Sequence, residues 1–232
     1  LGTDSVLRAA RETRPDSLVL FSSSEVYGRT EGGAVSEEAV TVIGPTTVPR
    51  WSYAAGKAVG EYLALAEHRR HELPVTIVRC FNTCGPRQID AYGMVLPAFL
   101  QQAISGRPLT VYGDGRQTRC FSYVGDVVRG VLALSRATSA RGEVFNIGCD
   151  EEISILDLAR RVRDLCGSRS EIRMVPYRQA YGDGFEEVPR RVPDLAKIRR
   201  WIDYRPEVGT TRLLEITRDW VRERQALDPS IP

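Results

Sequence analysis

Short apolar runs alternate with amphipathic stretches along the first third of the chain. Continuous apolar runs at 17–22 and 74–79 predict strands that are buried on both faces, as in a parallel sheet covered by helices. Apolar residues recur with a helical period at 3–13 and 51–71, which predicts helices before and between these strands. The order strand–helix–strand indicates right-handed βαβ units and therefore an α/β fold.

Similar signals continue to the end of the chain. We expect a strand at 143–148 and five further helices, at 94–105, 126–135, 155–166, 194–202 and 210–225. Ser154 and Asp157 form a capping box that opens helix 155–166, and Gly167 closes it. The segment 29–50 is rich in Gly, Thr and Pro and is long for a plain connection, so we expect a functional loop there.

Composition narrows the class of protein. Apolar residues make up 42% of the chain and charged residues 27%. The net charge is only +2, so the sequence does not indicate a basic surface that binds nucleic acid. The apolar runs are too short to span a membrane. The five cysteines lack metal-type spacing and there are only two histidines, so we expect no metal site. We expect the cysteines to be reduced and the protein to be cytoplasmic.

Tyr53 and Lys57 are the central candidates for chemistry. They lie four residues apart in the predicted helix 51–71, and residues at this spacing share one helix face. A lysine ammonium beside a phenol stabilises the phenolate, so such a tyrosine can act as a general base at neutral pH. Ser23 follows the predicted strand 17–22 and could hydrogen-bond to the same reacting oxygen. Taken alone, a tyrosine and a lysine at this spacing more often lie on an exposed helix face without any catalytic role.

Further segments accompany this pair in a characteristic order. They are Phe-Ser-Ser-Ser-Glu-Val-Tyr-Gly at 21–28, Arg-Cys-Phe-Asn-Thr-Cys-Gly-Pro-Arg at 79–87, Leu-Thr-Val-Tyr-Gly-Asp-Gly-Arg-Gln-Thr-Arg at 109–119 and Glu-Val-Phe-Asn-Ile-Gly at 143–148. In this order and spacing the chain resembles the extended short-chain dehydrogenase/reductase superfamily. Within that superfamily it is similar to the NAD-dependent nucleotide-sugar epimerase/dehydratase family.

The resemblance implies a Rossmann-like, doubly wound parallel sheet with a smaller C-terminal lobe. Residues 1–85 and 120–150 would belong to the NAD-binding domain, and 86–119 and 151–232 to the lobe that binds the nucleotide sugar. Family members begin with a Gly-x-x-Gly-x-x-Gly turn that holds the cofactor pyrophosphate at a helix N-terminus. None of the 20 glycines here fits that pattern. We therefore expect the chain to be the C-terminal part of a longer enzyme, with the segment that distinguishes NAD from NADP outside it.

The resemblance also implies a role for each matched residue. Tyr53 would take the proton of the C4 hydroxyl of a nucleotide-linked hexose, and Ser23 would contact the C4 oxygen. Lys57 would tune Tyr53 and, with it, bind the nicotinamide ribose of NAD. The implied substrate-binding residues are Asn82, Tyr112, Arg119 and Arg191. The two arginines suit a diphosphate because a guanidinium can bind it in a bidentate manner, although Arg190 competes with Arg191 for this role.

The sequence leaves the exact reaction open. Ser24 stands where 4,6-dehydratases carry an aspartate that protonates the leaving C6 hydroxyl, so that reaction loses weight. Glu25 is either a base at C5 or a structural carboxylate that accepts hydrogen bonds from backbone amides at the strand end. The segment 49–53 resembles that of decarboxylases, but many sequences of this general type resemble epimerases. The resemblance therefore favours a 4-epimerase similar to UDP-glucose 4-epimerase, with a 4,6-dehydratase or a UDP-glucuronate decarboxylase as alternatives. A non-catalytic dinucleotide-binding regulator is the alternative of another class.

The resemblance finally implies a homodimer. In the family the two longest helices of the nucleotide fold form a four-helix interface, and helix 51–71 would be one of them. Its apolar residues cover more than one face, at Tyr62, Leu63, Leu65 and Ala66. Ordinary burial against the sheet is the alternative explanation.

Overall fold

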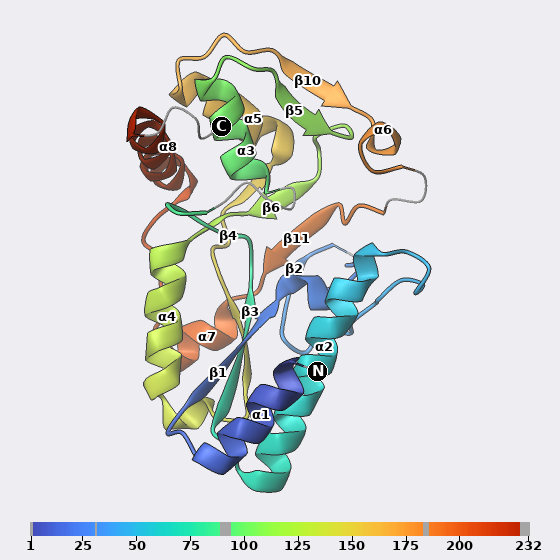
Figure 1. Ribbon diagram of the computed structural model, residues 1–232, viewed down its shortest axis with the longest axis vertical. Coiled ribbons are helices and arrows are strands. Elements are labelled where there is room, and N and C mark those ends of the chain that lie inside the picture. Colours follow the sequence, from blue (N-terminus) through green and yellow to red (C-terminus); the bar gives the residue numbers. More distant parts are fainter. Residues whose placement is uncertain (1, 31, 89–93, 183–185, 228–232) are drawn as a thin grey trace.

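A three-stranded parallel sheet forms the lower half of the molecule in Figure 1. The structure is a computed structural model that describes residues 2–30, 32–88, 94–182 and 186–227. The sheet has the order β1-β3-β8. Its strands are β1 (Leu18–Ser23), β3 (Val75–Cys80) and β8 (Val144–Ile147). The predicted strands and the α/β fold are confirmed.

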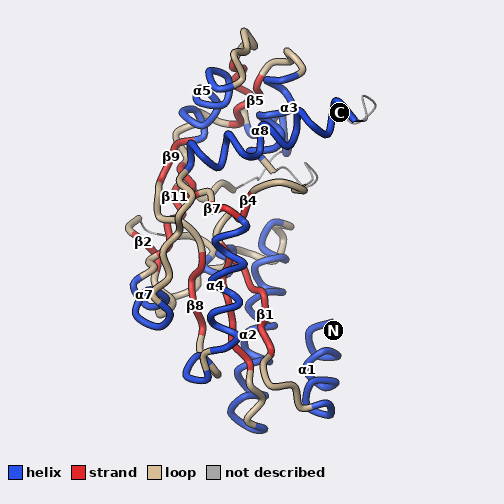
Figure 2. Tube along the Cα trace, turned by 90° about the vertical axis from the view of Figure 1, so that its left-hand side faces the viewer, coloured by secondary structure: helices blue, strands red, loops and turns tan. Residues whose placement is uncertain are grey.

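Helices cover both faces of this sheet because side chains alternate along each strand. Val75 and Ile77 of β3 pack with α1 and α2 on one face, whereas Val78 packs with α4 and α7 on the other. Figure 2 shows α1 lying beyond β1, at one side of the sheet. The bounds are α1 (Gly2–Thr13), α2 (Arg50–His71), α4 (Val124–Arg136) and α7 (Ala196–Ile202). The predicted helices there are confirmed within three residues.

A second apolar cluster gathers at the other end of the molecule (Figure 1). It holds buried side chains of the three helices α3 (Val95–Ile104), α5 (Ile155–Leu165) and α8 (Thr210–Leu227). They pack with β5 (Leu109–Tyr112), which pairs in parallel with β10 (Ile172–Val175). The Ser154 hydroxyl accepts a hydrogen bond from the Asp157 amide at 3.0 Å, which confirms the predicted cap of α5. The assignment of cofactor and substrate domains stays a prediction.

Very short strands connect the two ends. A four-stranded sheet has the order β2-β11-β6-β9, and β4 pairs with β7. The bounds are β2 (Ala34–Val35), β4 (Thr83–Cys84), β6 (Thr118–Cys120), β7 (Ser122–Tyr123), β9 (Glu152–Ser154) and β11 (Arg190–Pro193). The described residues also include the short helical segments η1 (Ser24–Tyr27), η3 (Thr138–Ala140) and α6 (Tyr177–Tyr181). Elements of two to five residues are too short to show a period in the sequence.

Within the ranges given above, no helix combines the length and the apolar character needed to cross a bilayer.

Candidate active site

The carboxyl end of β1 lies beside the first turns of α2. Lys57 Nζ donates a hydrogen bond to the Phe21 carbonyl oxygen at 2.8 Å and lies 5.9 Å from the centre of the Tyr53 ring. The spacing therefore brings Tyr53 and Lys57 together as predicted. Ser23 caps η1 at the same strand end, where its hydroxyl accepts from the Glu25 amide at 3.2 Å. The catalytic roles of these side chains stay predictions.

The side chains of Tyr53 and Lys57 can both reach a ligand at this strand end, and we expect that ligand to be the nicotinamide ribose of NAD. The Tyr53 side chain is 54% exposed, so its hydroxyl can reach a ligand. The Lys57 ammonium has three N–H donors, and its bond to the Phe21 carbonyl accounts for one of them. The Cys80 thiol lies beside Ser23 in the sheet register. Burial raises the pKa of Cys80 to about 11, although the charge of Lys57 acts in the opposite direction, so this thiol is neutral.

Glu25 is held by two arginines rather than by backbone amides. It forms an ion pair with Arg191, whose side chain is only 2% exposed, and its Oε2 lies 3.5 Å from Arg50 Nη2. Burial by itself raises the pKa of Glu25, but the charges of Arg191, Arg50 and Arg119 outweigh it and hold that pKa below its usual value. Glu25 is therefore ionised at neutral pH. Arg190, the alternative to Arg191 in the sequence, binds Glu152 instead, with 2.8 Å between Arg190 Nε and Glu152 Oε1.

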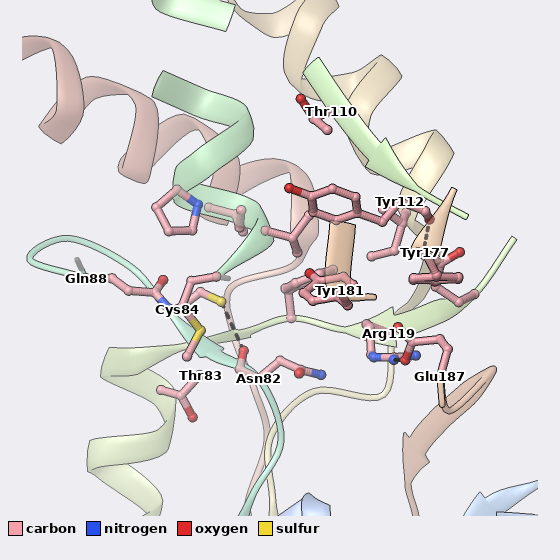
Figure 3. Close-up of a pocket in the computed structure, with 17 residues that line it drawn as sticks. Asn82, Thr83, Cys84, Gln88, Thr110, Tyr112, Arg119, Tyr177, Tyr181 and Glu187 are labelled. Atoms are coloured by element: carbon pink, nitrogen blue, oxygen red, sulfur yellow. Dashed lines mark hydrogen bonds and ion pairs between the residues drawn. The ribbon is translucent and has the colours of Figure 1, made fainter. Parts of the chain in front are cut away.

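A cavity of about 200 Å³ opens between the two ends of the molecule. Figure 3 shows Asn82, Tyr112 and Arg119 among the side chains that line it. Arg191 does not line this cavity, but it is the register neighbour of Arg119 across β11 and β6. The Asn82 amide donates to the Cys120 carbonyl oxygen at 2.9 Å, which fixes its side chain at the edge of the cavity. Three of the four predicted substrate-binding residues thus meet around one cavity.

Glu187 forms an ion pair with the guanidinium of Arg119, and both side chains line this cavity. Arg119 Nη2 donates to Glu187 Oε1 at 2.6 Å, and the same oxygen lies 3.7 Å from Arg50 Nη1. Together with the pair of Glu25 and Arg191, these contacts form a network of ion pairs. Its members are Arg50, Arg119, Arg191, Glu25 and Glu187. This network runs from the strand end near Ser23 to the cavity.

Tyrosines form the aromatic wall of the cavity. The rings of Tyr112 and Tyr181 meet edge to face with centroids 5.2 Å apart, and Tyr177 lies 6.4 Å from Tyr181 (Figure 3). Burial raises the pKa values of Tyr177 and Tyr181, so both phenols are neutral. Our reading of the sequence missed these two tyrosines and Glu187. The spacing of Tyr177 and Tyr181, four residues apart, was the available signal.

The geometry is that of an α/β protein with a tyrosine–lysine pair at a strand end and an arginine- and tyrosine-lined cavity beside it. A family model described as NAD dependent epimerase/dehydratase family matches residues 1–148, and the chain belongs to this family. The family is NAD-dependent, as its description states.

Relatives with several reactions match almost the whole chain. UDP-N-acetyl-alpha-D-glucosaminuronate decarboxylase of Bacillus cytotoxicus is 41% identical over 96% of this chain and 68% of that protein. UDP-glucuronic acid decarboxylase 1 of Xenopus tropicalis is 36% identical, over 100% of this chain and 53% of its own length. For dTDP-glucose 4,6-dehydratase of Streptomyces niveus the identity is 35%, with 97% and 63% covered. The chain thus spans between 53% and 68% of the length of these relatives.

Solved structures of the same family share the fold. UDP-glucuronic acid 4-epimerase from Bacillus cereus, in complex with NAD, has a TM-score of 0.82 and 30% identity over 96% of this chain and 66% of its own. dTDP-glucose 4,6-dehydratase from Bacillus anthracis, in complex with NAD, has a TM-score of 0.84 and 25% identity over 97% and 68%. The predicted Rossmann-like fold class is confirmed.

Proposed function

We propose that the full-length protein oxidises C4 of a UDP-linked hexuronate and then releases the C6 carboxylate as CO2. The observation that carries this proposal is the charge of the site between Tyr53 and the cavity. Arg50 and Arg191 surround an ionised Glu25 there, and Arg119 is the register neighbour of Arg191, so three guanidinium groups gather at this place. Such a site suits an anionic sugar, and the relatives at 41% and 36% identity are named as decarboxylases.

In this reaction Tyr53 takes the proton from the C4 hydroxyl, and Ser23 hydrogen-bonds to the same oxygen. The Lys57 ammonium stabilises the phenolate of Tyr53. Tyr53 and Lys57 would hold the nicotinamide ribose of NAD, and the cofactor would supply the acceptor for the C4 hydride and its source for the return step. The resulting C4 ketone is β to the C6 carboxylate. The C5–C6 bond can therefore break with its electrons moving to the C4 oxygen, and C5 then takes a proton.

A 4,6-dehydration is less well supported because it needs an acid at the C6 hydroxyl. Ser24 is only 3% exposed and therefore faces the protein interior. Glu25 is already ionised, because the charges around it hold its pKa low. Neither side chain can supply the proton that a leaving hydroxyl requires.

The 4-epimerase that the sequence favours stays as the second candidate. It is supported by the similarity to UDP-glucuronic acid 4-epimerase, whose named substrate also carries a carboxylate. An epimerase would use the same Tyr53 and Lys57. The 4-keto sugar would, however, rotate in the site and present its opposite face before the hydride returns to C4. The two candidates differ in whether C6 is kept and in whether the configuration at C4 is inverted.

The test is incubation of the full-length protein with NAD and UDP-glucuronate or UDP-N-acetylglucosaminuronate labelled with 13C at C6. We expect labelled CO2 and a UDP-pentose in the NMR spectrum. A C4 epimer that retains the label would establish the epimerase instead. UDP-glucose and dTDP-glucose serve as neutral-sugar controls, and a 4-keto-6-deoxy product from either would reject both candidates. Binding of NAD without turnover of any sugar would indicate the non-catalytic regulator.

A further inference from the structure

A buried ion pair lies beneath Tyr53 and Lys57. Glu61 of α2 is 6% exposed and Arg79 of β3 is 8% exposed. Arg79 Nε donates to Glu61 Oε1 at 3.0 Å and Arg79 Nη2 donates to Glu61 Oε2 at 2.7 Å, so the pair is bidentate. The Ser22 hydroxyl donates a further hydrogen bond to the same carboxylate. Glu61 is therefore fixed against β1 and β3 at once.

Glu61 shares a helix face with the two predicted catalytic side chains. Tyr53, Lys57 and Glu61 are spaced by four residues along α2, and side chains at this spacing are neighbours. A glutamate and a lysine in this relation ordinarily attract each other. Yet in the described part of the chain no ion pair joins them, and Lys57 Nζ bonds to the Phe21 carbonyl instead.

Arg79 is held in place by its own surroundings. Its guanidinium lies 4.8 Å from the centre of the Tyr27 ring, and its Nη1 donates to the Glu37 carbonyl oxygen at 3.1 Å. The Tyr27 hydroxyl is in turn anchored on Asn146 at 2.6 Å. Burial by itself lowers the pKa of Arg79, but the hydrogen bonds and charge of Glu61 more than offset it, so the guanidinium is charged.

We propose that Arg79 is a positioning residue that sequesters the Glu61 carboxylate and so keeps the Lys57 ammonium available to Tyr53. A planar guanidinium binds a carboxylate through two parallel hydrogen bonds, whereas an ammonium is a point charge, so Arg79 outcompetes Lys57. Without Arg79, Glu61 would be a buried charge whose remaining cation is Lys57, one helical turn away. The proposal rests on the proposed function, in which Tyr53 is the base.

Glu61 is the carboxylate that lies one helical turn from Lys57 on the same helix. Tyr53 and Glu61 face it from its own helix. From β3 it is faced by Cys80, a neutral thiol because burial raises its pKa to about 11, while Arg79 of the same strand is bound to Glu61. Among the described residues no ion pair joins a carboxylate to Lys57, and Glu61 is paired with Arg79.

The test compares Arg79→Met with the double variant Arg79→Met/Glu61→Gln in the full-length protein with NAD. In Arg79→Met, Glu61 captures Lys57, so kcat falls by about 10²-fold with little change in KM, and the acidic limb of the pH–rate profile moves to higher pH. Removing the charge of Glu61 frees Lys57 again. The double variant should therefore recover most of kcat and the parent position of the limb.

A merely structural pair predicts the opposite order, because the double variant would then be no more active than the single one. That result, or an unmoved limb in a folded Arg79→Met, overturns the proposal. If Arg79→Met does not fold, Arg79→Lys with and without Glu61→Gln makes the same comparison, since lysine keeps the charge but loses the fork.

A readout without substrate separates this proposal from the proposed function. The near-ultraviolet absorbance of tyrosinate, taken as the difference from Tyr53→Phe, reports the pH at which Tyr53 ionises. That pH should rise in Arg79→Met and return in the double variant, even if no nucleotide sugar is turned over. An unchanged titration in all variants contradicts the role of Arg79, whatever the enzyme's reaction is.

Discussion

Replacing Glu187 with glutamine should strengthen the binding of a nucleoside diphosphate. Glu187 Oε1 accepts from Arg119 Nη2 at 2.6 Å and lies 3.7 Å from Arg50 Nη1. The carboxylate therefore pairs with the guanidinium group that we expect to bind a diphosphate. A ligand must either displace Glu187 or bind beside its negative charge. Glutamine keeps the shape and one acceptor but removes the charge.

The size of the effect follows from Coulomb's law. A carboxylate about 6 Å from a phosphate is repelled by about 0.7 kcal/mol at the dielectric constant of water and by about 2.8 kcal/mol at an effective value of 20. The Glu187 side chain is 23% exposed, which places it between these limits. We expect a gain of about 1–2 kcal/mol, which is about 5- to 30-fold in Kd.

Isothermal titration of UDP into the full-length protein measures this gain. It should shrink as salt is added, because added ions screen partly exposed charges. Glu186→Gln is the matched control, since Glu186 binds Arg29 at 2.6 Å and does not line the cavity. Unchanged or weaker UDP binding in Glu187→Gln, or an equal gain in the control, would refute the reasoning.

Three further predictions concern the base, the buried charges and the assembly. Tyr53→Phe should lower turnover by about 10²–10⁴-fold with an unchanged circular dichroism spectrum, and near-normal turnover would remove Tyr53 from the mechanism. Arg191→Met should raise the pKa of Glu25, which Arg191 holds below the usual 4.5. The stability that a lowered carboxyl pKa contributes is present above pH 4.5 and is lost as pH falls through the folded-state pKa. The acid-unfolding midpoint should therefore move to higher pH, by more than in the control Arg190→Met. Light scattering should show a homodimer in which Tyr62, 68% exposed here, is buried, and a Tyr62→Glu variant should shift it toward the monomer; a monomeric parent protein would contradict the dimer.

The sequence alone determined the features that depend on near neighbours along the chain. The apolar runs of β1 and β3, the helical period of α2 and the cap at Ser154 are all local signals. The meeting of Tyr53 and Lys57 is local as well, because a helix brings residues four apart onto one face. These signals, with the order of the motifs, were enough for the fold class and the family.

Only the tertiary structure decided which charges meet. Glu25 and Arg191 are 166 positions apart, and Arg119 and Glu187 are 68 apart. No periodicity encodes such pairs, because they depend on how the short strands β6 and β11 align at the join between the two ends of the molecule. The same holds for Arg79, which β3 places against Glu61 of α2. Local propensity selects helices and strands, but long-range packing selects the partner of each buried charge, and here those partners shape the site.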